Sequence, residues 1–511
     1  MIRQRSTLHG VGFWRAGWST AALALGLLAG PVQASVEPDL LPPRSDRNTV
    51  LVQQNQTLLN LPGFEASGPL AQALQRRQGE QILREIHQQM RVLDDPLVSA
   101  GLQAIVDRLV AVARMPTPMT VLVIDDPTLN AFAVPGSVVA VNSGLILKAR
   151  SVDELAGVLA HELAHVHQHH FERRMAELRQ TRWLVLGGML AGLAASQADN
   201  DVGAAVLTGT QALAIDRQLA YSRGQEQEAD RIGLQLLQGA GYAPQALGDF
   251  FEVMQKNQGL PSYVPDFVLT HPLTRERISD ARQRTAWLDR PAVDPGAQQR
   301  FELLQGRVAV LSLQASLTEL QARSQRRDPE QVTLALLLAR QQRFAEAQQV
   351  LQPIVTAHPD WLAAQVALVQ TLLAQQQRQP DPVRGTPLRT ALAVLTQRWP
   401  DQPVTHWLQA QTALQQGQGN AALGLLQALA TQFPYQRTYW EALEQAATQT
   451  HRPAAEVLRY RAERLNLMGD LPAAVVALER AEKLAQRDAD QAALLRTIQR
   501  RLQDWREVKG R

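Results

Sequence analysis

One segment decides how this chain is interpreted, and it reads Ser151-Val-Asp-Glu154-Leu-Ala-Gly-Val-Leu-Ala-His161-Glu162-Leu-Ala-His165. Ser151 is followed three residues later by Glu154, a capping box that predicts a helix beginning at this point. The helix is narrow, because four of its residues are small, which predicts close packing against a partner helix. The small residues are Ala156, Gly157, Ala160 and Ala164.

The helix carries a His-Glu-x-x-His motif. His161 and His165 lie one turn apart on the same face, where both imidazoles can reach one zinc ion. Glu162 lies beside them, in position to hold a water and act as general base. The alternative is two histidines and a glutamate on a solvated helix face.

A catalytic zinc has three protein ligands and one open position, so a third ligand is needed. A second helical run, from Tyr221 to Gly233, contains Glu226 and Asp230 one turn apart. We expect Glu226 to bind the metal and Asp230 to accept the outer N–H of a ligating histidine. Glu228 points elsewhere and is expected to be a solvent-side charge. The alternative for Glu226 is an ordinary acidic surface residue.

These motifs resemble the zinc peptidase family that includes the CAAX prenyl proteases and the HtpX-type heat-shock proteases. The matching segments are His161-Glu162-x-x-His165, Glu226-x-x-Ala229-Asp230, Asn130-Ala-Phe-Ala133 and Asn142-Ser-Gly144-Leu. Together with the N-terminal leader, Thr270-His271-Pro272-Leu273 and the C-terminal repeats, they are similar to the family's periplasmic members, the beta-barrel assembly-enhancing proteases.

The resemblance implies a role for each matched position. His161, His165 and Glu226 are implied as ligands of one Zn2+ per chain, and Glu162 as the general base. The strand from Val138 to Asn142 is implied to align substrate as an added strand.

His271 is a further candidate ligand. Pro272 disfavours helix at His271, so the imidazole projects from a loop and could take the fourth zinc position in place of water. The resemblance to periplasmic members points the same way. Arg277 is a candidate to stabilise the carbonyl oxyanion. The alternative is that His271 only caps or packs its loop.

The pattern along the chain predicts an α+β fold: a mostly helical zincin-type domain with a small sheet, followed by an all-α region. Residues 119–125 are typical of a strand, and residues 131–134 and 138–141 flank Pro135-Gly136 as a hairpin. We expect a metallopeptidase domain over 35–290, a helical linker over 291–329 and TPR-like repeats over 330–511.

The repeats are indicated by Ala-x-x-x-Leu, which occurs four times, and by an aromatic residue or histidine before proline, which occurs three times. The pairs are Ala347/Leu351, Ala391/Leu395, Ala422/Leu426 and Ala474/Leu478, and the second motif is His358-Pro359, Trp399-Pro400 and Phe433-Pro434. The last two prolines are 34 residues apart, the tetratricopeptide period. Such repeats form a surface that binds other proteins. A plain helical bundle is the alternative.

The N-terminus has the order of a secretory signal peptide: arginines, an apolar stretch and Val32-Gln-Ala34. Cleavage after Ala34 predicts a periplasmic protein, and an uncleaved membrane anchor is the alternative. The three arginines before Ala34 account for the net charge of +3, so the mature chain is neutral and has no electrostatic footprint for nucleic acid. The chain has no cysteine, which excludes disulfides and thiol catalysis.

Two further segments have alternative interpretations. At their offsets from the motif, His167, His169 and His170 leave the ligand face, so we expect them to be solvent-exposed or weakly metal-binding. Residues 183–195 form an apolar run too short to span a bilayer, either a buried helix or a hairpin that touches a membrane or gates the cleft.

The combined reading is a periplasmic zinc endopeptidase that degrades or helps assemble outer-membrane proteins. Its implied partners are protein substrates, outer-membrane proteins and their assembly machinery, with peripheral membrane contact as an addition. The alternative is a chaperone or assembly factor whose zinc site is structural or rarely used.

Overall fold

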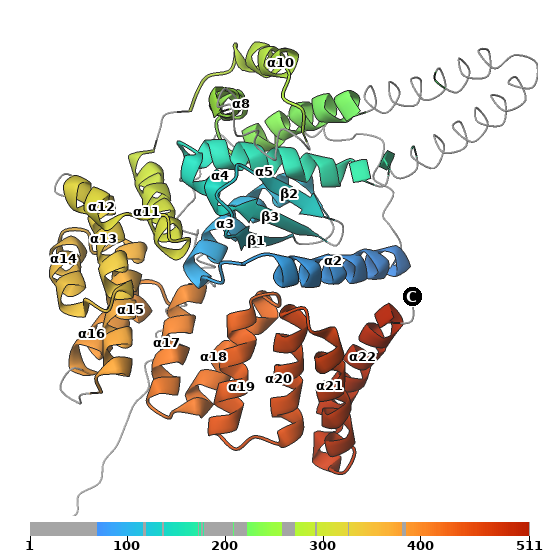
Figure 1. The fold of residues 1–511 in the computed structure, drawn as a ribbon, viewed down its shortest axis with the longest axis vertical. Coiled ribbons are helices and arrows are strands. Elements are labelled where there is room, and N and C mark those ends of the chain that lie inside the picture. Colours follow the sequence, from blue (N-terminus) through green and yellow to red (C-terminus); the bar gives the residue numbers. More distant parts are fainter. Residues whose placement is uncertain are drawn as a thin grey trace, which may run out of the picture. The chain divides into compact units, whose positions relative to one another are not determined.

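The structure is a computed structural model. It describes residues 69–115, 119–134, 137–171, 222–257, 271–291, 294–324, 327–380 and 385–509, with four isolated positions between 173 and 208. The expected signal peptide and the apolar run at 183–195 lie outside the described residues. The α+β class is confirmed, because a three-stranded sheet lies among helices and the C-terminal region is all helical (Figure 1).

The sheet has the strand order β1-β3-β2. Strand β1 (Thr120–Ile124) pairs parallel to β3 (Val138–Asn142), and β2 (Ala131–Val134) pairs antiparallel to β3. The predicted strand and hairpin are therefore present. Because β3 has a partner on both sides, it has no free edge, and the implied alignment of substrate on residues 138–142 is wrong.

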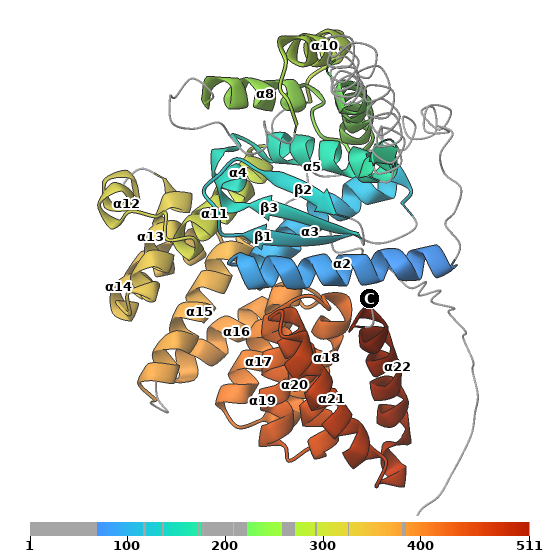
Figure 2. The same ribbon diagram turned by 45° about the vertical axis from the view of Figure 1, so that its right-hand side comes forward.

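Both faces of the sheet are covered, which explains the continuous apolar runs of β1 and β3. Leu122, Ile124, Val138 and Ala140 pack against α2 (Pro69–Gln89). The alternate residues of the same strands face α3 (Pro96–Ala113) and α5 (Val152–His167) in the main core. Both ribbon views place α5 on one side of the sheet and α2 on the other (Figures 1 and 2).

Helix α5 begins where the capping box predicts. The Ser151 hydroxyl accepts a hydrogen bond from the backbone N–H of Glu154 at 3.2 Å. The reciprocal bond differs, because the Glu154 carboxylate accepts from the backbone N–H of Arg150 at 2.7 Å. The predicted close packing is also present: a Cβ on Gly157 would lie 3.3 Å from Cα of Leu247 on α8 (Gln245–Asn257).

The short helix α4 (Ser143–Lys148) follows β3 directly and requires a glycine at its start. A Cβ on Gly144 would lie 2.0 Å from the backbone oxygen of Pro127. Gly144→Ala is therefore expected to destabilise the fold by about 3 kcal/mol, because backbone must move to make room. A thermal melt measures the loss.

The control is Gly248→Ala, whose added methyl would meet only side-chain carbons at 3.7 and 3.8 Å. This substitution is expected to be neutral or to stabilise by up to about 1 kcal/mol, since alanine favours helix. Equal melting temperatures for the two variants would contradict the close approach at Gly144.

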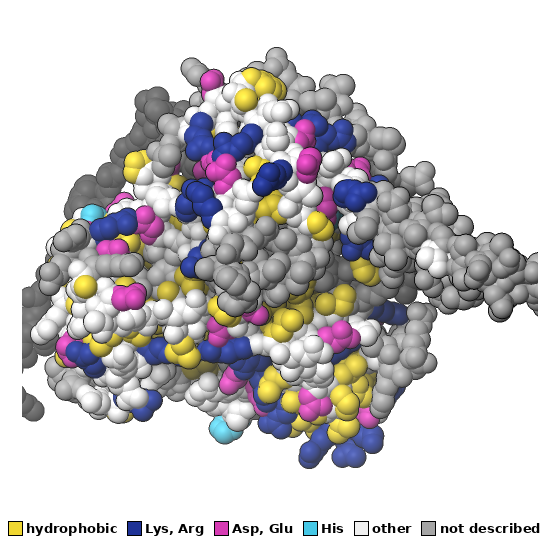
Figure 3. Space-filling view, turned by 45° about the horizontal axis from the view of Figure 1, so that its top comes forward, with side chains coloured by type: hydrophobic (Ala, Val, Ile, Leu, Met, Phe, Trp, Pro, Cys, Tyr) yellow, Lys and Arg dark blue, Asp and Glu magenta, His cyan; other side chains and the backbone are white. Residues whose placement is uncertain are grey.

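Helix α10 (Arg275–Thr285) packs on α8 beside the core. Basic and acidic side chains alternate over this face of the molecule (Figure 3), and they pair with one another, as Arg282 does with Glu252 and Arg290 with Asp249. Helix α11 (Pro295–Leu311) follows and joins two cores, because Phe301 lies in the core around the sheet and Leu303 in the next one.

The rest of the described chain is a series of short helices, each packed on its neighbours in sequence. They are α12 (Leu317–Ser324), α13 (Asp328–Arg340), α14 (Phe344–Ala357), α15 (Leu362–Arg378), α16 (Gly385–Arg398), α17 (Pro403–Gln415), α18 (Gly419–Gln432), α19 (Arg437–Gln449), α20 (Ala454–Leu467), α21 (Leu471–Ala485) and α22 (Ala492–Lys509).

The four Ala-x-x-x-Leu pairs all lie on helices of this series, and the first three lie on every second helix. They fall on α14, α16, α18 and α21, and all eight side chains are buried. The residues before proline, His358, Trp399 and Phe433, each follow directly on a helix end. The longer step to the fourth pair has a simple cause, since helices α19 and α20 lie between α18 and α21.

The helices that open the described chain pack against those that close it. Arg501 of α22 bonds both Glu80 of α2 and Glu463 of α20, at 2.9 and 3.0 Å. Farther along, Arg307 of α11 binds Asp95 through two nitrogens at 2.7 and 2.8 Å, and both residues are buried. Helix α2 is therefore held to the end of the helical series by a charged contact, and α11 is held to the start of α3 by another.

Candidate metal centre

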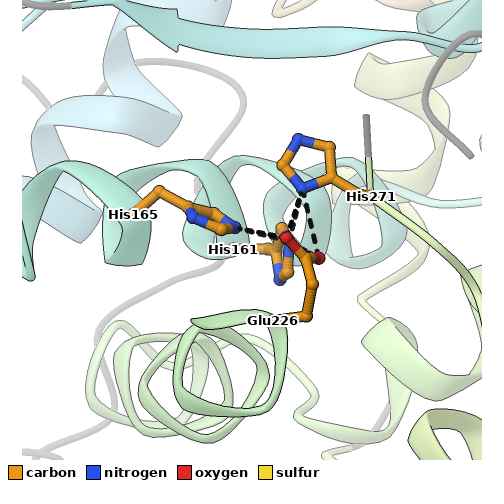
Figure 4. A group of neighbouring side chains, drawn as sticks. All are labelled: His161, His165, Glu226 and His271. Atoms are coloured by element: carbon orange, nitrogen blue, oxygen red, sulfur yellow. Dashed lines mark hydrogen bonds and ion pairs between the residues drawn. The ribbon is translucent and has the colours of Figure 1, made fainter. Parts of the chain in front are cut away.

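Four side chains converge beside the sheet: His161, His165, Glu226 and His271 (Figure 4). One ligand atom from each lies within 4.8 Å of all the others. The two motif histidines come from α5, Glu226 from the helix over residues 222–239, and His271 from the loop before α10. The structure thus brings together all four predicted metal ligands.

The spacing of these atoms fits zinc. His165 Nε2 lies 3.1 Å from His161 Nε2, and Glu226 Oε2 lies 3.4 Å from the same atom. His271 Nδ1 is 3.0 Å from Glu226 Oε1 and 3.5 Å from His161 Nε2. Tetrahedral zinc with bonds of about 2.0–2.1 Å separates its ligand atoms by about 3.3–3.4 Å. The nitrogen and carboxylate donors are also those that zinc takes.

His161 is held from its outer side by Asp230, as predicted. Its Nδ1 lies 3.0 Å from Asp230 Oδ1, and both side chains are buried. This contact is possible because α5 and the helix over residues 222–239 lie very close together. A Cβ on Gly233 would lie only 3.3 Å from the backbone nitrogen of His161.

Arg277 contacts the carboxylates of the site. Its Nε and one terminal nitrogen bond both oxygens of Asp230 at 2.7 Å. The other terminal nitrogen lies 3.0 Å from Glu226 Oε2 and donates to the Pro272 carbonyl at 2.9 Å. Every nitrogen of this buried guanidinium therefore has an acceptor already.

Glu162 lies at the edge of the ligand cluster. Its side chain accepts a hydrogen bond from the backbone N–H of Ala133 in β2, and burial raises its pKa. Among the described residues, its buried Oε1 atom has no hydrogen-bond partner, although His271 Nε2 lies 3.5 Å away. A buried carboxylate oxygen of this kind is suited to a water or a reacting group.

The charges of the site are strongly coupled. Burial opposes ionisation of Glu226 and Asp230, but the histidine and arginine contacts outweigh it and lower both pKa values. Burial also opposes the imidazolium of His161, yet Asp230 and Glu226 raise its pKa to about 9. Burial lowers the pKa of His165 well below its usual range. The site thus contains two ionised carboxylates, Glu226 and Asp230, and a neutral imidazole, that of His165.

Three residues differ from the sequence prediction. His167 and His170 are buried, and His170 contacts His165, so the expectation that these two histidines are solvent-exposed is wrong. Glu228 is not a free solvent-side charge, because it bonds His170 and Arg173. The prediction for His170 assumed that the helix continues past the motif, but α5 ends at His167. The run of histidines after the motif was the only sequence signal for this contact.

Comparison with known proteins agrees with this geometry. Residues 96–285 match the model of peptidase family M48. A beta-barrel assembly-enhancing protease of Yersinia pestis is 30% identical over 460 residues, which cover 88% of this chain and 90% of that protein.

Two other relatives match smaller parts. The beta-barrel assembly-enhancing protease of Escherichia coli (strain K12) is 31% identical over 306 residues, 58% of this chain and 62% of that protein. The mitochondrial metalloendopeptidase OMA1 of Schizosaccharomyces pombe is 35% identical over 188 residues, 36% of this chain and 51% of that protein. With the His-Glu-x-x-His helix, the Glu226 donor and a near full-length relative, this chain belongs to the M48 metallopeptidases.

Proposed function

We propose that this protein is a periplasmic zinc-dependent endopeptidase that acts on outer-membrane proteins or helps their assembly. The observation that carries the enzymatic part is the convergence of four nitrogen and carboxylate donors beside Glu162. His161, His165 and Glu226 are the residues that would hold the metal.

When bound, zinc polarises the scissile carbonyl and lowers the pKa of water in the site. Glu162 takes the proton of the attacking water and passes it to the nitrogen of the leaving amine. The Ala133 N–H fixes the carboxylate in place, and its raised pKa brings Glu162 nearer to the working pH of a general base.

The substrate backbone would lie along the outer edge of β2. The backbones of Asn130 and Asn142 are hydrogen-bonded to each other. By alternation, the backbone N–H and C=O groups of Phe132 and Val134 point toward β3, whereas those of Ala131 and Ala133 point outward. The Ala133 N–H donates to Glu162 on this outer side. A peptide added at this edge would place its carbonyl group beside the general base.

Arg277 would act as a positioning residue. All its nitrogens are engaged by Asp230, Glu226 and the Pro272 carbonyl, so the geometry does not favour the oxyanion role that the sequence suggested. Its contacts orient the metal-binding carboxylate and the carboxylate behind His161, which is how outer partners tune a zinc site.

His271 would regulate the site as a fourth ligand. Its Nδ1 lies among the donor atoms, and a fourth protein ligand closes the position that water needs. His271→Ala is expected to keep its zinc and to hydrolyse an unfolded substrate about 10-fold faster or to degrade itself, because water regains that position. Peptide hydrolysis and zinc content are measured together.

Arg275→Ala is a suitable control for this substitution, since Arg275 is exposed at the start of α10. Unchanged proteolysis by His271→Ala, in cells and with purified protein, would contradict the regulatory role.

The compartment and the substrates rest on the leader sequence and on the names of the relatives. Two measurements test them. N-terminal sequencing of periplasmic material is expected to begin at Ser35, and a full-length chain retained in the inner membrane would contradict export by cleavage. Cross-linking with the inactive Glu162→Gln protein is expected to capture outer-membrane proteins, and their absence from the captured set would contradict the substrate class.

The helical series would consist of tetratricopeptide-type repeats that bind substrates or partners. Buried Ala and Leu pairs on every second helix from α14 to α18 support this repeat type. A cavity of about 480 Å³ lies where α3 and α11 meet the first repeats, lined in part by Leu303, Trp361, Trp399 and Arg398. Its lining is mostly apolar and includes the charged residues Arg300, Arg398 and Asp360, which suits a segment of another polypeptide.

A further inference from the structure

A second histidine lies against the outer side of His165. The Nδ1 atoms of His165 and His170 are 2.8 Å apart, the distance of a hydrogen bond. The other ring nitrogen of His170, Nε2, lies 3.1 Å from Glu228 Oε2. Neither His170 nor Glu228 was expected to belong to the site.

The backbone bends to bring the two rings together. In a continuous helix, residue 170 would be rotated by about 140° from residue 165 and would face away from it. Instead α5 ends at His167, and His169 adopts a φ of 51°, in the left-handed region. A residue other than glycine in this region costs about 1–2 kcal/mol, and here the conformation ends the helix and turns residue 170 toward residue 165.

The contacts fix where the hydrogens lie. His165 Nε2 faces His161 and Glu226 across the ligand cluster, so it must present a lone pair to a metal. Its hydrogen is then on Nδ1 and is donated to Nδ1 of His170. His170 must therefore carry its own hydrogen on Nε2, and it donates this hydrogen to the Glu228 carboxylate. Both bonds point in one direction, away from the metal site.

The surroundings hold this chain of donors in place. Gln225, which is 2% exposed, donates from its side chain to the His170 carbonyl at 3.0 Å. Arg173 contacts the same Glu228 oxygen through both terminal nitrogens at 3.2 Å. These contacts hold the backbone of His170 and the carboxylate of Glu228 in place.

We propose that His170 is a positioning residue for the ligand His165, and that Glu228 sets the tautomer of His170. The inference rests on the proposed zinc site and extends it. Each of the two motif histidines then has an outer acceptor of its own: the carboxylate of Asp230 for His161, and the neutral imidazole of His170 for His165. Such outer acceptors set the ring orientation and basicity of a ligand and hence the affinity for the metal.

Zinc affinity, measured by competition with a chromophoric chelator, tests the role of His170. His170→Phe keeps a ring but removes the acceptor, and it is expected to weaken zinc binding about 10–100-fold. His170→Asn keeps an oxygen near the position of Nδ1 and is expected to retain an affinity within about threefold of the native protein. His167→Phe is the matched control, since His167 is also buried on α5, contacts Gln168, and is expected to bind zinc normally.

Two measurements separate positioning from a merely structural effect. Melting temperatures of the zinc-free proteins are expected to agree for the native, His170→Phe and His170→Asn chains, because the contact serves the metal site. In nitrogen-15 spectra of histidine-labelled native protein, His170 is expected to be neutral with its hydrogen on Nε2. These spectra need no variant and test the arrangement even if His170→Phe does not fold.

The outcomes are distinct. Zinc binding by His170→Phe within twofold of the native value, equally weak binding by His170→Asn, or a His170 hydrogen on Nδ1 would each overturn the inference while leaving the zinc site intact. Failure of the native protein to bind zinc would instead overturn the proposed function.

Discussion

Glu162→Gln is expected to lower the rate of peptide hydrolysis by about 10²–10⁴-fold while zinc content stays near one per chain. The amide has almost the shape of the carboxylate but cannot take a proton from water. Because the side chain lies beside the donor cluster without being one of its four ligands, metal binding should survive. Single-turnover cleavage of an unfolded protein and metal analysis of the same sample provide the two readouts.

Glu276→Gln serves as the control, because Glu276 is an exposed carboxylate in the first turn of α10. Its activity should equal that of the native protein. If Glu162→Gln cleaved within tenfold of the native rate, Glu162 would not be the general base, and the enzymatic reading would need another proton acceptor.

Glu226→Gln is expected to weaken zinc binding by more than about 100-fold, a larger loss than for any outer partner of the site. An amide oxygen is a poor ligand for zinc compared with a carboxylate, and one of three ligands is then lost. The buried Arg277 would keep Asp230 as its partner, so the fold should persist. Metal analysis after dialysis against a chelator measures the loss.

The matched control is Glu228→Gln on the same helix. Its amide oxygen can still accept the hydrogen of His170, so this variant should keep zinc near one per chain. The reverse result, with zinc retained in Glu226→Gln and lost in Glu228→Gln, would show that the third ligand had been misassigned.

The parts of the site that lie on single regular helices were predictable from sequence. His161, His165, Glu226 and Asp230 depend only on the 3.6-residue period and on the donor chemistry of zinc. The apolar strand runs and the capping box predicted the sheet and the start of α5 in the same way, since both signals are local.

Other features depended on contacts that local patterns do not contain. The position of His170 depends on the left-handed backbone of His169, which no helical count includes. Strand β3 is the central strand because β1 pairs with it across the intervening β2, so only the assembled sheet shows that β2 lies at an edge. The acceptors of Arg277 could not be predicted either, because Asp230 lies 47 residues away in the sequence and meets Arg277 only in the folded chain.

The contacts between α2 and the last helices also determine when the molecule can finish folding. Arg84 meets Asn466 across 382 residues of sequence, and Arg501 meets Glu80 across 421. Closing a loop of this length costs about 5 kcal/mol of chain entropy, and such distant contacts form late. During synthesis from the N-terminus, α2 gains these partners only after α22 has been made. A chain that ends before α22 leaves Glu80 without its arginine.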